Sequence, residues 1–151
     1  MTDDRSLVKK AFRARELAYA PYSRFKVGAA LLLSDGRVYT GCNIENAAYS
    51  PSVCAERTAF VKAVSDGIRD IRLFAAIAVA GGPEGAAKLG HAWPCGVCRQ
   101  VMMEFCDPKA FRVIIGREED DFSVHTLEAL LPYGFGPRDL ESTTKAGGQA
   151  L

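Results

Sequence analysis

The 151-residue chain has the length of one domain, and its contents of 48% hydrophobic and 25% charged residues are typical of a globular protein. A net charge of +1, with no block of like charge, argues against nucleic acid as a partner, because a phosphate backbone requires a basic stripe. No secretion signal is recognisable, and no apolar run reaches 18 residues, so we expect a cytoplasmic protein without a membrane partner. Five cysteines, an odd number in a compartment that keeps thiols reduced, favour metal binding over disulfides.

The first part of the chain predicts a helix followed by a pair of strands. Apolar residues recur with helical period from about Asp4 to Ala20, where Pro21 would end the helix. Val27 to Leu33 is a short apolar run, as expected of a strand that is buried on both faces. The glycine-containing turn at 34–37 then predicts a hairpin with a partner strand from Val38 to Ile44.

The rest of the chain alternates predicted helices and strands. In order, we expect a helix from Cys54 to Asp66, a strand from Ile71 to Ala80, a helix from Pro94 to Cys106, strands from Ala110 to Gly116 and from Phe122 to Thr126, and a short helix from Leu127 to Leu131. The segment from Gly81 to Trp93 is expected to be a long loop. This alternation predicts a mixed α/β sheet layered with helices, whose strand order does not follow from the sequence. Residues 1–140 would form the domain, and residues 141–151, rich in Ser, Thr, Gly and Lys, a disordered tail.

Three cysteines and a glutamate have the spacing of a catalytic zinc site. Cys95 and Cys98 belong to a Pro-Cys-x-x-Cys motif at the expected start of one helix, and Cys54 lies at the start of another. Zinc takes four ligands and keeps one position for water in catalytic sites, so three thiolates would leave that position open. Glu56 follows Cys54 by two residues and would transfer protons beside the metal without being a ligand.

A closed zinc site with four cysteines is the main alternative, with Cys42 or Cys106 as the fourth ligand. This alternative leaves Glu56 without a role, and we interpret both extra cysteines as small buried hydrophobic residues. Three thiolates and Zn²⁺ sum to a charge of −1, which weakens the metal as a Lewis acid. We therefore predict that Arg57 hydrogen-bonds the ligand sulfurs; otherwise it is a surface arginine.

Polar residues outside the metal motif have less specific predicted roles. Asn43 and Glu45 lie two apart at a strand end and would share a face, where an amide and a carboxylate can hold a hydroxyl group; the alternative is a solvated loop. We expect structural roles for His91 and His125, with metal ligation by His91 as the weaker alternative.

Four motifs resemble the small homotetrameric zinc-dependent cytidine deaminases, over about residues 5 to 137. The motifs are Phe25 to Ala30, Gly41 to Tyr49, Cys54 to Arg57 and Pro94 to Val101. Cys-x-Glu followed by Pro-Cys-x-x-Cys is the order found in zinc deaminases. The resemblance implies a three-layer α/β/α fold with a five-stranded mixed sheet. It also implies hydrolytic deamination of cytidine and 2′-deoxycytidine, in pyrimidine salvage, with one Zn²⁺ per subunit.

The resemblance assigns roles to the matched residues. Cys54, Cys95 and Cys98 would bind zinc, and Glu56 would move the proton. The nucleoside would be held by Phe25 against the pyrimidine, by Asn43 and Glu45 at the ribose 3′-hydroxyl, by the Ala55 backbone N–H at the ring carbonyl and by the Trp93 carbonyl at the amino group. Phe135 would insert into the site of a neighbouring subunit, so that the homotetramer would share its active sites.

The chain departs from the family pattern in the loop before the second cysteine motif. The segment from Gly82 to Trp93 is longer than usual, and Trp93 stands where Ser or Thr is common, which leaves the preference for substituted bases open. One rival is a deaminase of modified cytosine nucleosides or nucleoside antibiotics, as in the blasticidin-type enzymes, which resemble this chain less at Asn43 to Asn46. Another rival is a non-catalytic module that zinc stabilises.

Overall fold

A single mixed sheet of five strands organises residues 2–144, the part of the chain that this computed structural model describes. The strands are β1 (Phe25–Leu33), β2 (Val38–Cys42), β3 (Phe74–Pro83), β4 (Arg112–Gly116) and β5 (Phe122–Thr126). Their order across the sheet is β2-β1-β3-β4-β5. Of the neighbouring strands in this sheet, β3 and β4 run parallel and the other pairs are antiparallel. The predicted five-stranded mixed sheet is confirmed.

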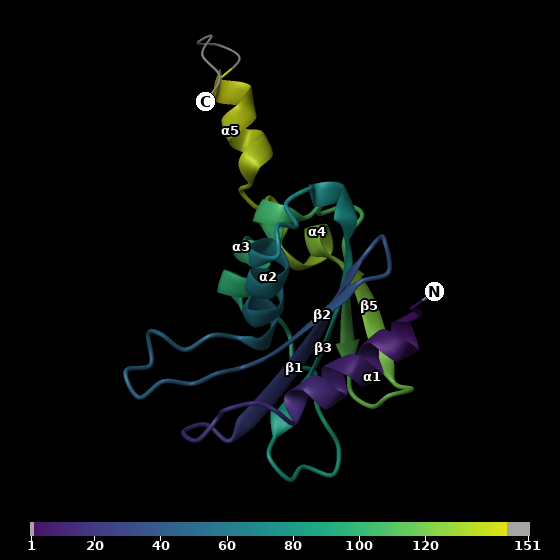
Figure 1. Ribbon diagram of the computed structural model, residues 1–151, viewed down its shortest axis with the longest axis vertical. Helices are drawn as coiled ribbons and strands as arrows, with labels where there is room; N and C mark the ends of the chain where they lie inside the picture. Colours follow the sequence, from purple (N-terminus) through teal and green to yellow (C-terminus); the bar gives the residue numbers. More distant parts are fainter. Residues whose placement is uncertain (1, 145–151) are drawn as a thin grey trace.

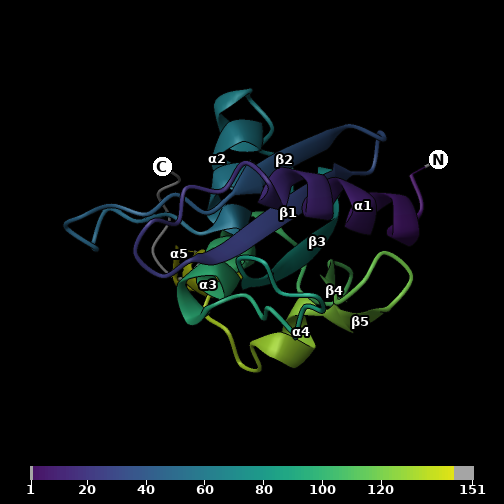
Figure 2. The ribbon, with the colours of Figure 1, turned by 90° about the horizontal axis from the view of Figure 1, so that it is seen from below.

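Helices cover both faces of this sheet and make the fold a three-layer α/β/α structure, as predicted (Figures 1 and 2). Helix α1 (Asp4–Arg15) lies on one face. The other face carries α2 (Ala55–Ser65), α3 (Gly96–Phe105) and the short α4 (Leu127–Leu130). A final helix, α5 (Pro137–Thr144), points away from the body of the molecule (Figure 1).

The long apolar run of β1 results from its place between the two helical layers. Ala30 and Leu32 pack in the core beneath α1, whereas Ala29, Leu31 and Leu33 pack in the larger core beneath α2 and α3. Successive side chains of a strand point to opposite faces, so a strand covered on both sides needs apolar residues at every position.

Several element boundaries differ from those predicted, because contacts distant in sequence define them. Helix α1 ends at Arg15 rather than near Ala20, since the following segment becomes extended: the Tyr19 N–H donates to the Asn43 carbonyl at 3.0 Å. Strand β3 begins at Phe74, after a 3₁₀ turn over Ile71–Leu73. It continues to Pro83, three residues into the expected loop, because its end pairs with the start of β1.

The expected disordered tail overlaps the last helix. Residues 141–144 belong to α5, whose start at Pro137 fits the preference of proline for a first helical turn. Residues 145–151 lie outside the described part of the chain. Among residues 2–144, no helix is both long and apolar enough to cross a membrane.

Candidate active site

The three predicted ligand cysteines meet at the N-termini of two helices. Cys54 is the N-cap of α2, Cys95 is the N-cap of α3, and Cys98 lies in the first turn of α3. Their Sγ atoms all lie within 4.8 Å of one another, with 3.8 Å between Cys54 and Cys95 and 3.5 Å between Cys95 and Cys98. The Cys98 backbone N–H donates to the Cys95 sulfur at 3.4 Å, so an unpaired amide of the helix start stabilises that thiol.

These distances fit a zinc ion. Three sulfurs at about 2.3 Å from a tetrahedral zinc are separated by roughly 3.8 Å, which is close to the spacing between Cys54 and Cys95. Among the described residues, this cluster contains three cysteines and no fourth metal ligand. Cys106 is instead buried in the core beneath α2 and α3, and the Cys42 thiol donates to the Leu17 carbonyl at 3.4 Å. The geometry therefore favours an open three-thiolate site over the closed alternative.

Arg57 lies beside the cysteine cluster. Its Nη2 is 3.8 Å from the Cys54 sulfur and donates to the Ser52 carbonyl at 3.2 Å. Its Nε is buried and has no hydrogen-bond partner among the described residues. A hydrogen bond from the Cys98 thiol and one from Arg57 lower the pKa of Cys54, which favours the thiolate that a metal binds. The structure thus places Arg57 where its predicted contact with a ligand sulfur can form.

Glu56 is a buried carboxyl next to the thiol cluster. It lies in the first turn of α2 and is only 4% exposed. Burial raises the pKa of Glu56 to about 7, and the negative charge of Cys54 adds to this effect. A carboxyl with such a pKa can both accept and release a proton near neutral pH, as a general acid and base must do.

A cavity of about 410 Å³ opens over the cluster. Its walls are formed by Phe25, Val27 and Asn43 on the side of β1, by Cys54, Ala55 and Glu56 on α2, and by His91, Ala92, Trp93 and Cys95 before α3. The structure therefore gathers most of the predicted site residues around one space.

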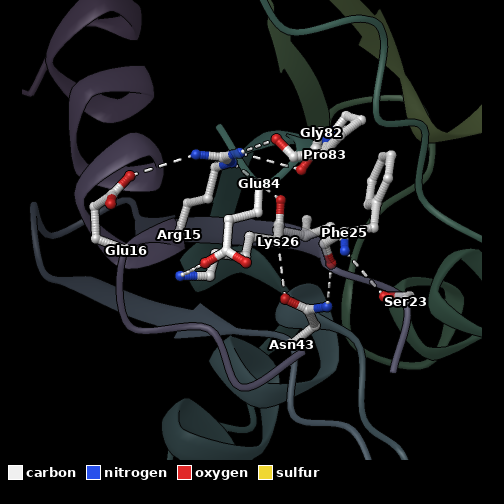
Figure 3. A network of polar contacts seen from close by, with 10 residues as sticks. Arg15, Glu16, Ser23, Phe25, Lys26, Asn43, Gly82, Pro83 and Glu84 are labelled. Carbon is white, nitrogen blue, oxygen red and sulfur yellow. Dashed lines mark hydrogen bonds and ion pairs between the residues drawn. The ribbon is translucent and has the colours of Figure 1, made fainter. Parts of the chain in front are cut away.

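Asn43 fixes the strand that carries Phe25 (Figure 3). Its Oδ1 accepts the Val27 N–H at 2.8 Å, and its Nδ2 donates to the Phe25 carbonyl at 2.8 Å. An amide side chain offers two donor hydrogens and two acceptor lone pairs, so one of each remains for a ligand.

Glu45 and Phe135 lie outside this cavity. Glu45 accepts hydrogen bonds from the backbone N–H groups of Tyr22 and Ser23 and from the Ser23 hydroxyl, in a neighbouring hollow that Tyr49 also lines. The structure does not bring it to the same space as Asn43. Phe135 lies in the turn before α5, where its carbonyl accepts from Gln100 at 2.9 Å and its side chain is 57% exposed.

An aromatic stack on the cavity wall was missed by the sequence analysis. The rings of His91 and Trp93 are nearly parallel, with centroids 5.5 Å apart, and His125 of β5 meets the indole edge-on at 4.9 Å. His91 is thus one of the residues that line the cavity. Its position two residues before Trp93 and four before Cys95 was the available signal, whereas the contact with β5 depends on the tertiary fold.

Three thiols at two helix N-termini, beside a buried carboxyl that faces the same cavity, define the site of a metal-dependent hydrolytic enzyme. A family model described as the cytidine and deoxycytidylate deaminase zinc-binding region matches residues 1–115. The chain belongs to this family of deaminases.

Individual relatives agree with this assignment. The chain is 48% identical over 138 residues to the cytidine deaminase of Sporosarcina psychrophila, covering 91% of this chain and 95% of the relative. It is 47% identical to the cytidine deaminase of Halalkalibacterium halodurans, over 91% of this chain and 98% of the relative. The crystal structure of cytidine deaminase from Burkholderia pseudomallei superimposes with a TM-score of 0.79 at 47% identity, covering 88% of this chain and 99% of that one.

Proposed function

We propose that this protein deaminates cytidine and 2′-deoxycytidine to uridine and 2′-deoxyuridine, with release of ammonia, in cytoplasmic pyrimidine salvage. The observation that carries the proposal is the buried carboxyl of Glu56 beside the three-thiol cluster, in a cavity that also contains the ring of Phe25. Water adds to the ring carbon that bears the amino group, the carbon–oxygen bond forms, and the carbon–nitrogen bond then breaks.

Glu56 performs the proton transfers of this reaction. Cys54, Cys95 and Cys98 would hold a zinc ion, which when bound would supply the Lewis acid that makes water nucleophilic near neutral pH. Glu56 accepts the first proton that water loses and delivers it to the ring nitrogen. It then takes the remaining proton of the added hydroxyl group and transfers it to the leaving amine. Its burial and its pKa near 7 suit both directions of transfer.

The nucleoside is held by the walls of the cavity. Phe25 packs against the pyrimidine, the Ala55 N–H at the start of α2 donates to the ring carbonyl, and the Trp93 carbonyl accepts from the amino group. Asn43 binds the ribose 3′-hydroxyl through the donor and acceptor that β1 leaves free. Glu45 joins it once its hydrogen bonds to Ser23 open.

The assembly in this proposal is a homotetramer in which Phe135 completes a neighbouring subunit's site. Two features support it: the Phe135 side chain is exposed at the edge of the molecule, and it does not line the cavity of its own chain. A Phe135→Ala variant that stays tetrameric is expected to bind cytidine more weakly. An active monomer would contradict this role.

The decisive experiment follows the ultraviolet absorbance of cytidine with purified, zinc-assayed protein, together with ammonia release. We expect loss of the cytosine band with one ammonia per nucleoside, and loss of nearly all turnover in a Glu56→Ala variant that retains zinc. If the zinc-loaded wild type leaves cytidine and 2′-deoxycytidine unchanged, the proposal is wrong. A panel of modified cytosine nucleosides would then test the second candidate function, which the His91–Trp93 wall of the cavity favours.

A further inference from the structure

The guanidinium of Arg15, at the end of α1, links strands β1 and β3 (Figure 3). Helix α1 covers the face of the sheet opposite to α2 and α3, which carry the thiol cluster. The Arg15 Nε donates to the Lys26 carbonyl on β1 at 3.1 Å. Its Nη2 donates to the carbonyls of Gly82 and Pro83 on β3, at 3.1 and 3.0 Å. The side chain is only 11% exposed, and the charge-assisted hydrogen bonds to Lys26 and Gly82 are partly buried.

Gly28 allows the end of α1 to lie directly on β1. A methyl group at this position would be 2.1 Å from the Ala11 carbonyl oxygen and 2.3 Å from the Arg15 backbone nitrogen. The absence of a side chain thus brings Arg15 within reach of the strand ends. An ion pair between Lys26 and Glu84, with 3.0 Å between Nζ and Oε1, links the same two segments.

The residues that Arg15 holds lead into opposite walls of the cavity. Lys26 lies between Phe25 and Val27 in the sequence, and both of these neighbours line the cavity. The Gly82–Pro83 end of β3 continues into the loop that carries His91 and Trp93. The hydrogen bonds of Asn43 to Phe25 and Val27 extend the same network to the neighbouring strand.

We propose that Arg15 is a positioning residue for the nucleoside, which sets the spacing between the Phe25 wall and the His91–Trp93 wall from the opposite layer of the fold. The identity of the ligand depends on the proposed function, but the link between the walls does not. The thiol cluster and Glu56 are carried by the starts of α2 and α3, whereas the hydrogen bonds of Arg15 to other segments go to β1 and β3. Loss of Arg15 therefore affects binding of the nucleoside more than the chemical step.

Steady-state kinetics of zinc-loaded Arg15→Ala, Arg15→Lys and Arg13→Ala test this role. Arg13 is the matched control, because it is an exposed arginine in the same last turn of α1. We expect the KM for cytidine to rise about tenfold in Arg15→Ala, as for the loss of charged hydrogen bonds, with kcat changed less than about threefold. Arg15→Lys should lie between, because an ammonium lacks the planar fork. Arg13→Ala should match wild type.

A merely structural arginine would lower the melting temperature and the active fraction, and so the apparent kcat, while leaving KM unchanged; that result would overturn the proposal. If Arg15→Ala fails to fold, Arg15→Lys still tests the proposal, because its KM for cytidine should also rise above that of wild type.

Hydrogen exchange of the same variants tests the link without using turnover. Exchange should accelerate at the amides of 25–28 and at Glu84, whose N–H donates to the Arg24 carbonyl, while β4 retains its protection. Equal acceleration throughout the sheet would contradict the proposal. Inactivity of wild type towards cytidine would instead refute the proposed function, while the exchange pattern would still decide the role of Arg15.

Discussion

Gly41 of β2 lies directly against Ala55, the first residue of α2: a methyl group on Gly41 would be 2.4 Å from the Ala55 carbonyl oxygen. It would also be 2.6 Å from the backbone nitrogen of Ala59, one turn further along. Both neighbours are backbone atoms that cannot move aside by changing a rotamer. The separation of sheet and helix, and with it the position of Glu56, thus depends on the missing side chain.

Replacing Gly41 with alanine should therefore displace the start of α2. We expect Gly41→Ala to lower the free energy of unfolding by about 1–3 kcal/mol, as overpacking does, and to reduce turnover because Cys54 and Glu56 shift together. Chemical denaturation and the cytidine assay measure both effects. Gly90→Ala is the control, because no atom of the described residues other than those of Gly90 and its two chain neighbours would lie within 4 Å of the new methyl group. Equal stability of the two variants would show that the close approach is relaxed in solution.

Arg57→Gln should weaken the metal site while leaving the fold intact. The guanidinium lies 3.8 Å from the Cys54 sulfur and helps to lower the pKa of that thiol. Its loss leaves the negative thiolates without this neighbouring cation, so we expect zinc affinity and turnover to fall by about 10- to 100-fold. Competition with a chromogenic chelator measures the affinity, and Arg69→Gln, at an exposed arginine beyond α2, is the control. Unchanged affinity together with unchanged turnover would show that Arg57 is a surface residue.

The parts of the site that the sequence predicts well are those that lie within a single helical turn. Cys95 and Cys98 are three residues apart and Cys54 and Glu56 are two apart, so the start of a helix brings each pair together. Spacing within one helix cannot predict the 3.8 Å distance between the sulfurs of Cys54 and Cys95. This contact could be inferred only because both motifs supply ligands for the same metal ion.

Contacts between segments distant in sequence could not be predicted in this way. The bridge of Tyr19 to Ile44 ends α1 early, and the pairing of β1 with Pro83 lengthens β3. Strand alternation suggested that Asn43 and Glu45 share a face, but the regular strand stops at Cys42, and Glu45 turns to Ser23 instead.

The buried carboxyl of Glu56 should make the metal-free protein less stable as the pH rises. Its pKa is about 7 in the folded protein, against 4.5 for an ordinary glutamate, so the folded state binds more protons between these values and stability falls with pH. Above pH 7, Glu56→Gln should exceed wild type by on the order of 3 kcal/mol in free energy of unfolding. The gap should shrink as the pH falls towards 4.5, where the carboxyl is protonated in the folded protein and about half protonated in the unfolded chain, and it should close below that pH.

Denaturant titrations of zinc-stripped wild type and Glu56→Gln from pH 5 to 8 measure this difference. Cys54 shifts in the opposite direction and contributes stability that is lost as the pH falls, so only the difference between the two proteins isolates Glu56. A gap that does not change with pH would show that the carboxyl is solvated.

The five thiols should separate into classes by their reaction with iodoacetamide. Burial raises the pKa of the Cys106 thiol, so we expect it to stay unmodified at neutral pH, whereas the half-buried Cys42 reacts. Zinc should protect the ligand cysteines. After chelation, the exposed Cys95 and Cys54, whose lowered pKa favours the thiolate, should react before the buried Cys98. Peptide mass spectrometry with and without a chelator gives the order. Modification of Cys106 in folded protein as fast as Cys42 would contradict this packing.

Trp93 should limit the size of the group on the reacting end of the base. Its indole is stacked on His91 and meets His125 edge-on, and these two contacts favour its position in the wall. It lines the same cavity as Cys95 and Glu56, which places it beside the reacting end of the base in the proposed complex. We expect Trp93→Ala to raise the kcat/KM for N4-methylcytidine relative to cytidine by about tenfold, the usual discrimination for one methyl-sized group. Trp93→Phe retains an aromatic face towards His91 and should change the ratio less, which makes it the matched control. If both variants keep the wild-type ratio, the indole packs away from the base and the selectivity lies elsewhere in the cavity.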